Sequence, residues 1–395
     1  MKLLYDLAAS QPAQSSKFHG GSEYSKTVFE ELVKNKGNNL IEVFINPQNY
    51  VDDRLIKLCK ENNIKINECF SIEDINNLIN SNYYDVFYSA LPYTYSKLKV
   101  PVKTKFIYTI HGLRGIEVLG DKYEGKFVKK NFKFFVRKLL IKFFPDKLIE
   151  YRKKILNQLF SVTKNSYILV ASYHTKYAIM NHFNNISEDK IFVLYSPEKV
   201  ASKLCFDNEE LILSENKVKS KEYILMISGD RWLKNNYRAA KALDKLFSQN
   251  KCVLKNIKVL ILGVNKKDIY YRNLVNKERF VIEGYKDTQV LEILYKNAHL
   301  LLYPTLNEGF GYPPLEAMKY GTSVAVSAIS SITEICGDAV LYFNPYDLNE
   351  INNRVLESFD FNIMDEKRKI MKKQYEKISL KQKNSLSEIV KIIFN

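Results

Sequence analysis

Two carboxylates, Glu308 and Glu316, stand eight positions apart on either side of a Gly-Phe-Gly turn at 309–311. The apolar segment 299–303 before them predicts a buried parallel strand, and the two prolines at 313–314 suit the first turn of a helix. Open α/β sheets bind ligands where a strand ends and a helix begins. Glycines at such a place let backbone N–H groups approach a ligand closely. Because carboxylates accept hydrogen bonds from hydroxyls, the arrangement suits the hydroxyls of a sugar and of a ribose.

Each part of this segment also has a plainer interpretation. Glu316 falls in a first helical turn, where a carboxylate often only caps the helix and complements its dipole. The whole string 308–318 is more specific, because it resembles the signature E-G-F-G-x-P-x-L-E-A-M of retaining GT-B glycosyltransferases of family 4 and matches every fixed position. The resemblance implies a nucleotide-sugar donor whose ribose hydroxyls are held by Glu316. It also implies that the donor, and its sugar in particular, is contacted by Glu308, Gly309, Phe310, Gly311 and Leu315.

A second candidate loop, residues 228–236, follows the apolar run Tyr223–Ile227 and carries Arg231 and Lys234. Two cations three positions apart in a strand-to-helix loop can converge on one polyanion, since arginine binds phosphate in bidentate fashion and lysine adds a compact charge. The alternative is a solvated basic loop. The segment resembles the part of family 4 enzymes that neutralises the donor pyrophosphate, although Asp230 and Trp232 depart from its commonest form.

Two further segments of the second half resemble the same family. Residues 280–285 resemble the strand and turn that border the nucleotide base, which makes Gly284 a predicted donor contact. Residues 330–339 resemble the family's later Ser-Ser-x-x-Glu-x-x-Gly-Asp-Ala segment. The resemblance is therefore strong over 220–345 and limited to a few points in the first half.

In the first half, Gly20 and Gly21 lie in the loop Phe18–Tyr24 between a first strand and a helix. Such a glycine pair is often only a tight turn, but similar enzymes carry a glycine loop here that faces the donor diphosphate and the acceptor. His111 follows the apolar strand 106–110, and similar enzymes place there a histidine that contacts the donor sugar. The resemblance thus makes His111 and Glu308 the predicted catalytic residues, with Gly20 and Gly21 among the donor contacts.

Apolar runs of strand length alternate with helical patterns along the whole chain. This rhythm predicts an α/β protein with two Rossmann-like, doubly wound parallel sheets, the GT-B architecture with substrates meeting in a central cleft. We expect an acceptor-binding domain over 1–198, completed by a helix over 380–395 that crosses back, and a nucleotide-sugar-binding domain over 199–379. The expected strands are Lys2–Leu7, Leu40–Ile45, Asp85–Ser89, Phe106–Ile110, Tyr167–Ala171, Tyr223–Ile227, Ile257–Leu262, Phe280–Glu283, Leu300–Tyr303, Ser323–Val326 and Val340–Phe343.

The five cysteines are scattered without zinc-binding spacing, which favours a reducing, cytoplasmic setting and neither disulfides nor a structural metal. The opening residues 1–7 predict a first strand and not a signal peptide, and no run of 18 apolar residues exists. No Asp-x-Asp pair ends a strand, so we expect no metal site and no cofactor, the nucleotide-sugar being a substrate.

Net charge is +16, and the segment 122–154 alone holds twelve basic and three acidic residues. Within it, aromatic and aliphatic residues recur at helical spacing up to Pro145, which ends a helix. A basic amphipathic helix of this kind can lie on an anionic membrane, or it can pack its apolar stripe on its own domain. The membrane-facing candidates are Lys133, Arg137, Lys138 and Lys142.

Taken together, the sequence predicts a retaining, metal-independent hexosyltransferase that acts on a glycan or lipid-linked glycan in cell-surface polysaccharide or lipopolysaccharide assembly. The Lys-Asn and Ser-Ser-x-x-Glu details favour GDP-mannose as donor, with UDP- and dTDP-sugars open. A location in the cytoplasm or on the inner face of the membrane follows. The alternatives are an epimerase-like sugar-nucleotide enzyme and a non-catalytic protein that binds membranes or nucleic acid; no nucleic-acid motif is found, so no nucleic-acid partner is expected.

Overall fold

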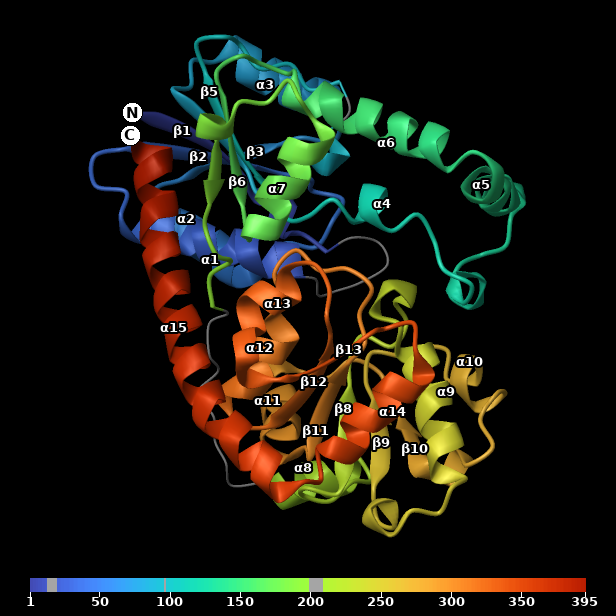
Figure 1. Cartoon of the computed structure of the whole chain (residues 1–395). Helices are drawn as coiled ribbons and strands as arrows, with labels where there is room; N and C mark the ends of the chain where they lie inside the picture. The colour runs from blue at the N-terminus through green and yellow to red at the C-terminus, as the bar shows by residue number, and fades with distance from the viewer. Residues whose placement is uncertain (13–19, 96, 199–208) are drawn as a thin grey trace. The chain divides into compact units, whose positions relative to one another are not determined.

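The computed structural model describes residues 1–12, 20–95, 97–198 and 209–395. Contacts within the chain divide it into two compact units. The first unit comprises Met1–Ile116, Asp146–Val200 and Ser379–Asn395, and the second comprises Glu117–Pro145 and Ala201–Ile378. Each unit is built around its own parallel sheet (Figure 1).

The first unit contains a seven-stranded sheet in the order β3-β2-β1-β4-β5-β6-β7. Every neighbouring pair is parallel, and strand β1 pairs Leu3 with Ile41 of β2 and with Val86 of β4. The order reverses between β1 and β4, which is the topological switch point of a doubly wound sheet. The strands are β1 (Lys2–Asp6), β2 (Leu40–Ile45), β3 (Lys65–Glu68), β4 (Val86–Ser89), β5 (Lys105–Ile110), β6 (Ser166–Val170) and β7 (Ile191–Val193).

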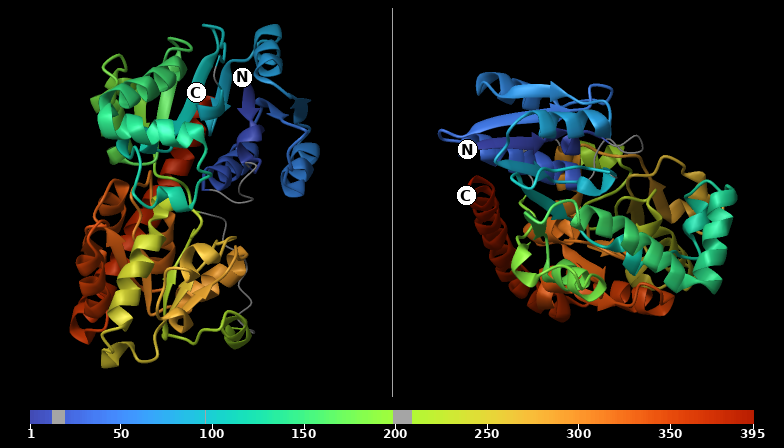
Figure 2. Two further views of the ribbon diagram at one scale, coloured as in Figure 1. Left: turned by 90° about the vertical axis from the view of Figure 1, so that its right-hand side faces the viewer. Right: turned by 90° about the horizontal axis from the view of Figure 1, so that it is seen from above.

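Helices cover both faces of this sheet. Leu3 and Tyr5 of β1 point into one apolar cluster, whereas Leu4 points into the other, as the two-residue period of a strand requires. The end of the last helix, with Ile389 and Ile393, packs into the first of these clusters, and Figures 1 and 2 show the two chain termini close together in this unit. The helices are α1 (Gly20–Lys34), α2 (Asp53–Glu61), α3 (Ile72–Ser81), α4 (Arg114–Glu117, which ends in the second unit), α6 (Pro145–Phe160), α7 (Tyr173–His182) and the end of α15 (Phe361–Phe394).

The second unit contains a six-stranded parallel sheet in the order β10-β9-β8-β11-β12-β13, with its switch point between β8 and β11. Along β8, Ile224 and Met226 belong to one apolar cluster and Tyr223 and Leu225 to the other, so both faces of this sheet are buried. The strands are β8 (Tyr223–Met226), β9 (Lys258–Ile261), β10 (Phe280–Ile282), β11 (Leu300–Tyr303), β12 (Ser323–Ser327) and β13 (Leu341–Phe343).

The helices of the second unit come from two separate parts of the chain, and the first part, Glu117–Pro145, contains α5. Helix α5 ends at Phe143, and Pro145 occupies the first position of α6, so the proline separates the two helices as expected. Among the described residues, no helix has both the length and the apolar character needed to cross a bilayer. The helices are α5 (Phe132–Phe143), α8 (Glu209–Glu215), α9 (Asn236–Phe247), α10 (Asp268–Tyr271), α11 (Thr288–Asn297), α12 (Tyr312–Lys319), α13 (Ser331–Cys336), α14 (Leu348–Glu357) and the first part of α15.

The architecture confirms the predicted fold class: two Rossmann-like parallel sheets and a helical C-terminus. Two strands were not predicted, β3 and β7, and both lie at the edges of the first sheet. The last helix begins at Phe361 and not near Leu380. Residues 199–208, which directly follow the predicted domain boundary, lie outside the described residues.

The segment Glu117–Pro145 packs with the second unit, whereas the sequence analysis assigns it to the first domain. A buried ion pair at 2.5 Å joins Asp121 to Arg238 of α9, and their side chains are 7% and 2% exposed. The Arg238 guanidinium also lies over the Tyr123 ring, and Tyr123 packs edge-on against Tyr237. These contacts join residues more than a hundred positions apart, and so local patterns do not reveal them.

We expect Asp121→Asn to destabilise the second unit by about 3–5 kcal/mol, since it leaves the buried Arg238 charge without its partner. Trp232, the one tryptophan of the chain, lies in this unit, and its fluorescence during urea unfolding measures the loss. Asp268→Asn breaks the exposed Asp268–Arg272 pair as a matched control and should cost below about 1 kcal/mol. Equal midpoints for the two variants would contradict a stabilising role for the buried pair.

Candidate functional site

The loops that follow β8 and β11 meet at the switch point of the second sheet. Strand β11 pairs directly with β8, with Leu300 opposite Ile224. The loop after β8 carries Lys234, and the loop after β11 carries Glu308. Because the carboxyl ends of neighbouring parallel strands lie at one edge, these two side chains, 74 positions apart in sequence, come into contact.

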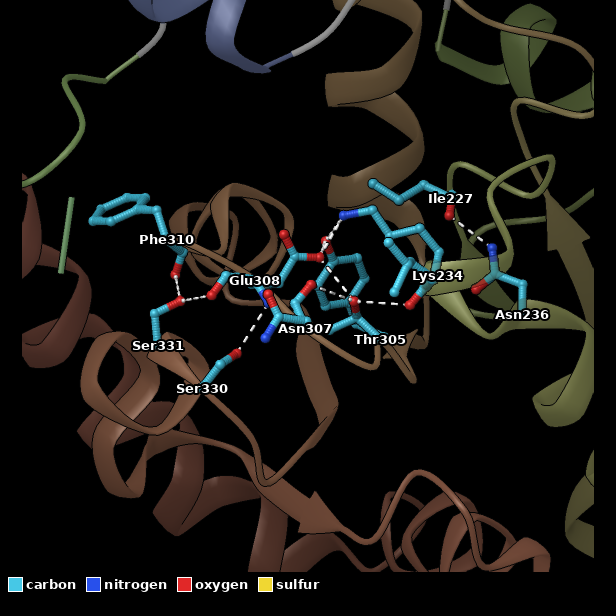
Figure 3. A network of polar contacts seen from close by, with 11 residues as sticks. Ile227, Lys234, Asn236, Thr305, Asn307, Glu308, Phe310, Ser330 and Ser331 are labelled. Atoms are coloured by element: carbon cyan, nitrogen blue, oxygen red, sulfur yellow. Dashed lines mark hydrogen bonds and ion pairs between the residues drawn. The ribbon is translucent and has the colours of Figure 1, made fainter. Parts of the chain in front are cut away.

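Lys234 and Glu308 form an ion pair through Nζ and Oε1 (Figure 3). The Lys234 amine also donates to the Tyr303 hydroxyl, which itself donates to Glu308 Oε1 at 2.6 Å. The Thr305 hydroxyl donates to the same oxygen at 2.8 Å. Oε1 thus accepts all three hydrogen bonds that the carboxylate receives from described residues, and a lysine, a tyrosine and a threonine fix its position.

This environment determines the charge of the site. Burial alone would raise the pKa of Glu308, but the Lys234 charge and the hydrogen bonds from Lys234, Tyr303 and Thr305 outweigh it and hold that pKa below its usual range. Burial, reinforced by the Glu308 carboxylate, raises the pKa of Tyr303 well above its ordinary value. At neutral pH, Glu308 is therefore ionised and Tyr303 is a neutral hydrogen-bond donor.

Backbone contacts hold the two loops together. The N–H of Leu306 donates to the carbonyl of Leu233 at 2.8 Å, so the loop after β11 is bonded to the loop after β8 just before Lys234. At the end of the loop after β8, Asn235 adopts a left-handed conformation with φ of 58°, and its side-chain amide donates to the carbonyl of Pro345. Asn236 donates back to the carbonyl of Ile227 at the end of β8 (Figure 3). The position of the lysine is thus set by its neighbours on both sides.

Two serines at the start of α13 support the glycine turn. The Ser330 hydroxyl accepts from the N–H of Glu308 at 3.0 Å, and Ser331 donates to the carbonyls of Glu308 and Phe310 (Figure 3). Gly311 has φ of +108°, and a Cβ there would lie 2.7 Å from Ile332, so this position requires glycine.

The remaining predicted donor contacts of the second unit take different places. Phe310 and Leu315 are buried, and the Phe310 ring packs against Tyr312. Glu316, on α12, is half-buried beside Tyr295, whose pKa is raised by burial and by this carboxylate. Arg231 is exposed in the loop of Lys234, and its charge acts on Tyr303.

The other two glycines lie in loops. Gly309 is half-buried between Glu308 and Phe310. Gly284 follows β10, and its carbonyl accepts from the N–H of Gly263 at 3.1 Å. A Cβ on Gly284 would meet no atom within 4 Å, so nothing in the fold itself demands a glycine at this position.

In the first unit, the structure brings His111 and the start of α1 together. His111 follows β5; its backbone N–H donates to the Tyr93 hydroxyl at 2.7 Å, and its Nε2 lies 2.9 Å from the carbonyl of Ala90. Since a carbonyl only accepts, Nε2 carries the proton in this contact. Tyr24 of α1 meets the His111 ring edge-on.

Gly20 and Gly21 are the first described residues of α1. A Cβ on Gly21 would lie 2.7 Å from Leu91, so this glycine allows the helix to approach the segment after β4. Phe18 and His19 of the predicted glycine loop lie outside the described residues.

The four basic candidates on α5 fall into two pairs. Arg137 and Lys138 both form ion pairs with Glu124, and they donate to the carbonyls of Leu119 and Asp121, respectively. Lys133 and Lys142 are exposed. The first pair therefore anchors the helix, and the second is available to a partner.

Sequence reasoning did not assign a role to several members of this network. In the sequence, Tyr303 is the last residue of an apolar strand, but in the structure its hydroxyl forms hydrogen bonds with both Lys234 and Glu308. Thr305 gives no signal of its own, and the serines at 330–331 stand out only as part of the family-like segment 330–339. The strand end before a glycine loop is the feature that could have pointed to Tyr303. Among the described residues, no group of three His, Cys, Asp or Glu side chains could hold a metal ion.

We expect Glu308→Gln to destabilise the second unit at pH 7 by about 2–4 kcal/mol, because the buried Lys234 loses its counter-ion. The folded-state pKa of Glu308 lies below the ordinary 4.5, so its contribution is present above pH 4.5 and is lost as the pH falls through the lower folded value. The gap between wild type and variant should therefore close in acid. Urea unfolding followed by Trp232 fluorescence between pH 7 and 3 measures this, with the exposed Glu278→Gln as control. A gap that is constant with pH would contradict the ion pair.

The part of the chain that carries this site is similar to known proteins. Residues 207–377 match the model of glycosyl transferases group 1. The O-antigen chain mannosyltransferase RfbU of Salmonella typhimurium is 29% identical over 215 residues, which cover 52% of this chain and 54% of the relative. The chain thus matches about half the length of this curated relative.

Solved structures with the same fold cover both units. A glycosyltransferase from Rickettsia africae superposes with a TM-score of 0.66 at 17% identity, covering 100% of this chain and 98% of the other. Anabaena Alr3699/HepE, solved in complex with UDP-glucose, gives 0.65 at 13% identity and covers 99% of each chain. Residues 207–377 are therefore similar to glycosyl transferases group 1, in a chain that has the GT-B fold and bacterial mannosyltransferases among its relatives.

Proposed function

We propose that the chain is a glycosyltransferase that moves a hexose from a nucleotide-sugar to a glycan or lipid-linked glycan acceptor, with retention of configuration and without a metal ion. The observation that carries this proposal is the Lys234–Glu308–Tyr303 network at the switch point of the second sheet. It presents an ionised carboxylate, a fixed ammonium group and an exposed arginine at the edge where doubly wound sheets bind nucleotides.

The cations of the β8 loop suit the donor diphosphate. Arg231 is exposed and forms no side-chain ion pair with a described residue, while Glu308 balances the charge of Lys234. The negative charge of a pyrophosphate would come next to Arg231, whose positive charge has no counter-ion among the described residues. We propose that Arg231 and Lys234 stabilise the charge that develops on the departing nucleoside diphosphate, as preorganised cations do in phosphate-leaving reactions.

The two carboxylates suit the hydroxyls of the donor. Oε1 of Glu308 is occupied by protein donors, so Oε2 is the oxygen that a sugar hydroxyl would approach. Glu316 is half-buried on α12, beyond the first turn of the helix, and would accept from the ribose hydroxyls. The backbone from Gly309 to Gly311, fixed by Ser330 and Ser331, would position the sugar.

The reaction exchanges one bond at the anomeric carbon for another. The bond from this carbon to the phosphate oxygen breaks, the bond to the acceptor oxygen forms on the same face, and the acceptor proton passes to the phosphate oxygen. We propose that His111 contacts the donor sugar. Its Nε2–H is engaged by the carbonyl of Ala90, which fixes the ring orientation.

The choice of donor and acceptor rests on the relatives. RfbU of Salmonella typhimurium is named as an O-antigen chain mannosyltransferase, and other matched relatives in Escherichia coli are mannosyltransferases as well. These names support mannose as the donor sugar and a glycan chain as the acceptor. We propose GDP-mannose as the donor and a lipid-linked glycan as the acceptor, at the cytoplasmic side of a membrane. HepE was solved with UDP-glucose, which keeps a UDP-sugar as the comparison donor.

The first test is nucleotide release from GDP-mannose and from UDP-, dTDP- and ADP-sugars, with EDTA present and no acceptor. We expect slow release of GDP from GDP-mannose, because water can replace the acceptor. No release and no nucleotide binding with any donor would contradict the proposal. Interconversion of the donor sugar without nucleotide release would instead support the epimerase-like alternative, and a requirement for added Mg²⁺ would contradict the metal-independent step.

Site variants connect that activity to the residues. Glu316→Gln and Lys234→Ala should each lower release at least about a hundredfold, as loss of a group that stabilises a transition state does. Lys234→Ala also leaves Glu308 unpaired, so its unfolding must be measured, whereas Glu316→Gln removes no member of the buried pair. Lys277→Ala, an exposed lysine outside the site, is the matched control. Wild-type rates in Glu316→Gln would contradict the assignment of this residue.

We further propose that helix α5 lies on an anionic membrane surface. The helix has no buried residue, and Phe132, Phe135, Leu139 and Phe143 form an exposed stripe whose side chains are 54–82% exposed. The opposite face is anchored, since Phe134 lies over Gly125 and Arg137 pairs with Glu124. An aromatic stripe flanked by lysines is the composition of helices that lie in the membrane interface.

Replacing Phe135 and Leu139 by serine and reversing the charge of Lys133 and Lys142 should weaken binding to anionic phosphatidylglycerol vesicles by at least about tenfold. Sedimentation of vesicles at low and high salt measures this, since the electrostatic part is screened by salt. Val275→Ser with Lys277→Glu alters an exposed apolar residue and an exposed lysine outside α5 and should leave binding unchanged. Equal binding by both variants would contradict a membrane role for α5.

A further inference from the structure

The first unit contains a cavity of about 930 Å³ at the carboxyl edge of its sheet. One side is formed by the segment after β4, a second by the segment after β5, and a third by helix α6. Loops that follow adjacent parallel strands form the ligand-binding edge of such sheets. The volume falls in the range of sites for organic ligands of substantial size.

The charged side chains among the described lining residues of the cavity are all basic. Among the described residues, its lining includes Lys97, Arg114 and Arg152 and no acidic residue. Arg152 donates to the carbonyl of Gly115, which holds α6 to the segment after β5. Arg114 is exposed and forms no ion pair with a described residue, so its guanidinium charge is not neutralised within the fold. The cavity therefore suits an anion, and phosphate in particular, which arginine binds in bidentate fashion.

Much of the rest of the lining is apolar, although Gln158, Ser161 and two tyrosines also contribute to it. The chains of Leu98, Leu113, Leu156 and Leu159 contribute to it, with Ile155 at the exposed side of α6. A free sugar phosphate would gain little from these aliphatic groups, whereas a hydrocarbon chain would bury apolar surface against them. Cations and aliphatic walls in one cavity thus indicate an anionic amphiphile.

The cavity lies next to His111. Gly112 and Leu113 of the lining directly follow this histidine, and the lining Tyr93 accepts the hydrogen bond of its backbone N–H. A ligand held here would place its head group near the residue that the proposed function assigns to the sugar. Both the cavity and His111 belong to the first unit.

We propose that this cavity binds the lipid-phosphate part of the acceptor: Arg114 holds the phosphate, and the leucine-lined wall holds the first part of the hydrocarbon chain. The identification of the ligand as part of the acceptor rests on the proposed function, but the binding itself does not depend on sugar transfer. It names the acceptor class as a phosphate-bearing lipid and not a soluble glycan.

The test is calorimetric titration of the full chain with dodecyl phosphate below the concentration at which it forms micelles. Inorganic phosphate and dodecyl maltoside, a neutral amphiphile with the same chain, are titrated in parallel. We expect dodecyl phosphate to bind at least about tenfold more tightly than either, because only it uses both the cations and the apolar wall. Equal binding of inorganic phosphate would reduce the cavity to an anion site, and equal binding of dodecyl maltoside would remove the role of charge; either result would overturn the proposal.

Two variants locate the binding in the cavity. Arg114→Ala should weaken dodecyl phosphate binding about tenfold or more, and Ile155→Trp should weaken it by filling the space for the chain. Lys154→Ala, an exposed cation on the same helix outside the lining, should leave it unchanged, as should the α5 variant. Thermal unfolding of each variant shows that it folds. Unchanged binding in both cavity variants would overturn the proposal, whereas binding without any sugar transfer would contradict only the proposed function.

Discussion

The ion pair between Lys234 and Glu308 is the interaction on which the site of the second unit depends. Lys234 is buried, and a buried ammonium group is stable only with a counter-ion and hydrogen bonds that replace its water. Glu308 and the Tyr303 hydroxyl supply both. In return, the pair fixes the end of the β8 loop against the β11 loop, so the same interaction holds the two loops in register.

The charges in this arrangement favour an anionic ligand, although the net positive charge of the site is small. Lys234 and Glu308 neutralise one another, and the exposed Arg231 adds one positive charge at the same edge. A free pair of cations would repel each other and would attract any polyanion. In the observed arrangement, the ion pair with Glu308 holds Lys234 in a defined position, and Arg231 lies beside it. A charge that stabilises a transition state must be held in such a fixed position.

Much of the fold follows from local sequence, and much of the site does not. Strands with continuous apolar runs, such as Leu300–Tyr303, are buried on both faces and were predicted to the residue. Strand β3 was missed because it is a short, polar edge strand, Lys65–Glu68, in which no residue is buried. The contact between Lys234 and Glu308 requires the strand order, which sets β8 beside β11 and which no local pattern encodes. The packing of Asp121 on Arg238 was missed for the same reason.

The two units also differ in how strongly their chemistry constrains the sequence. In the second unit, the β11 loop needs a glycine at 311, a carboxylate at 308 and a hydroxyl at 331, because backbone conformation and hydrogen bonds have strict geometry. In the first unit, the cavity beside His111 needs only cations and aliphatic volume, and dispersion and burial accept leucine, isoleucine or valine with little difference. A polar site of this kind therefore leaves a recognisable string in the sequence. An amphiphile site leaves almost none, and for this reason it was found from the structure and not from the residues alone.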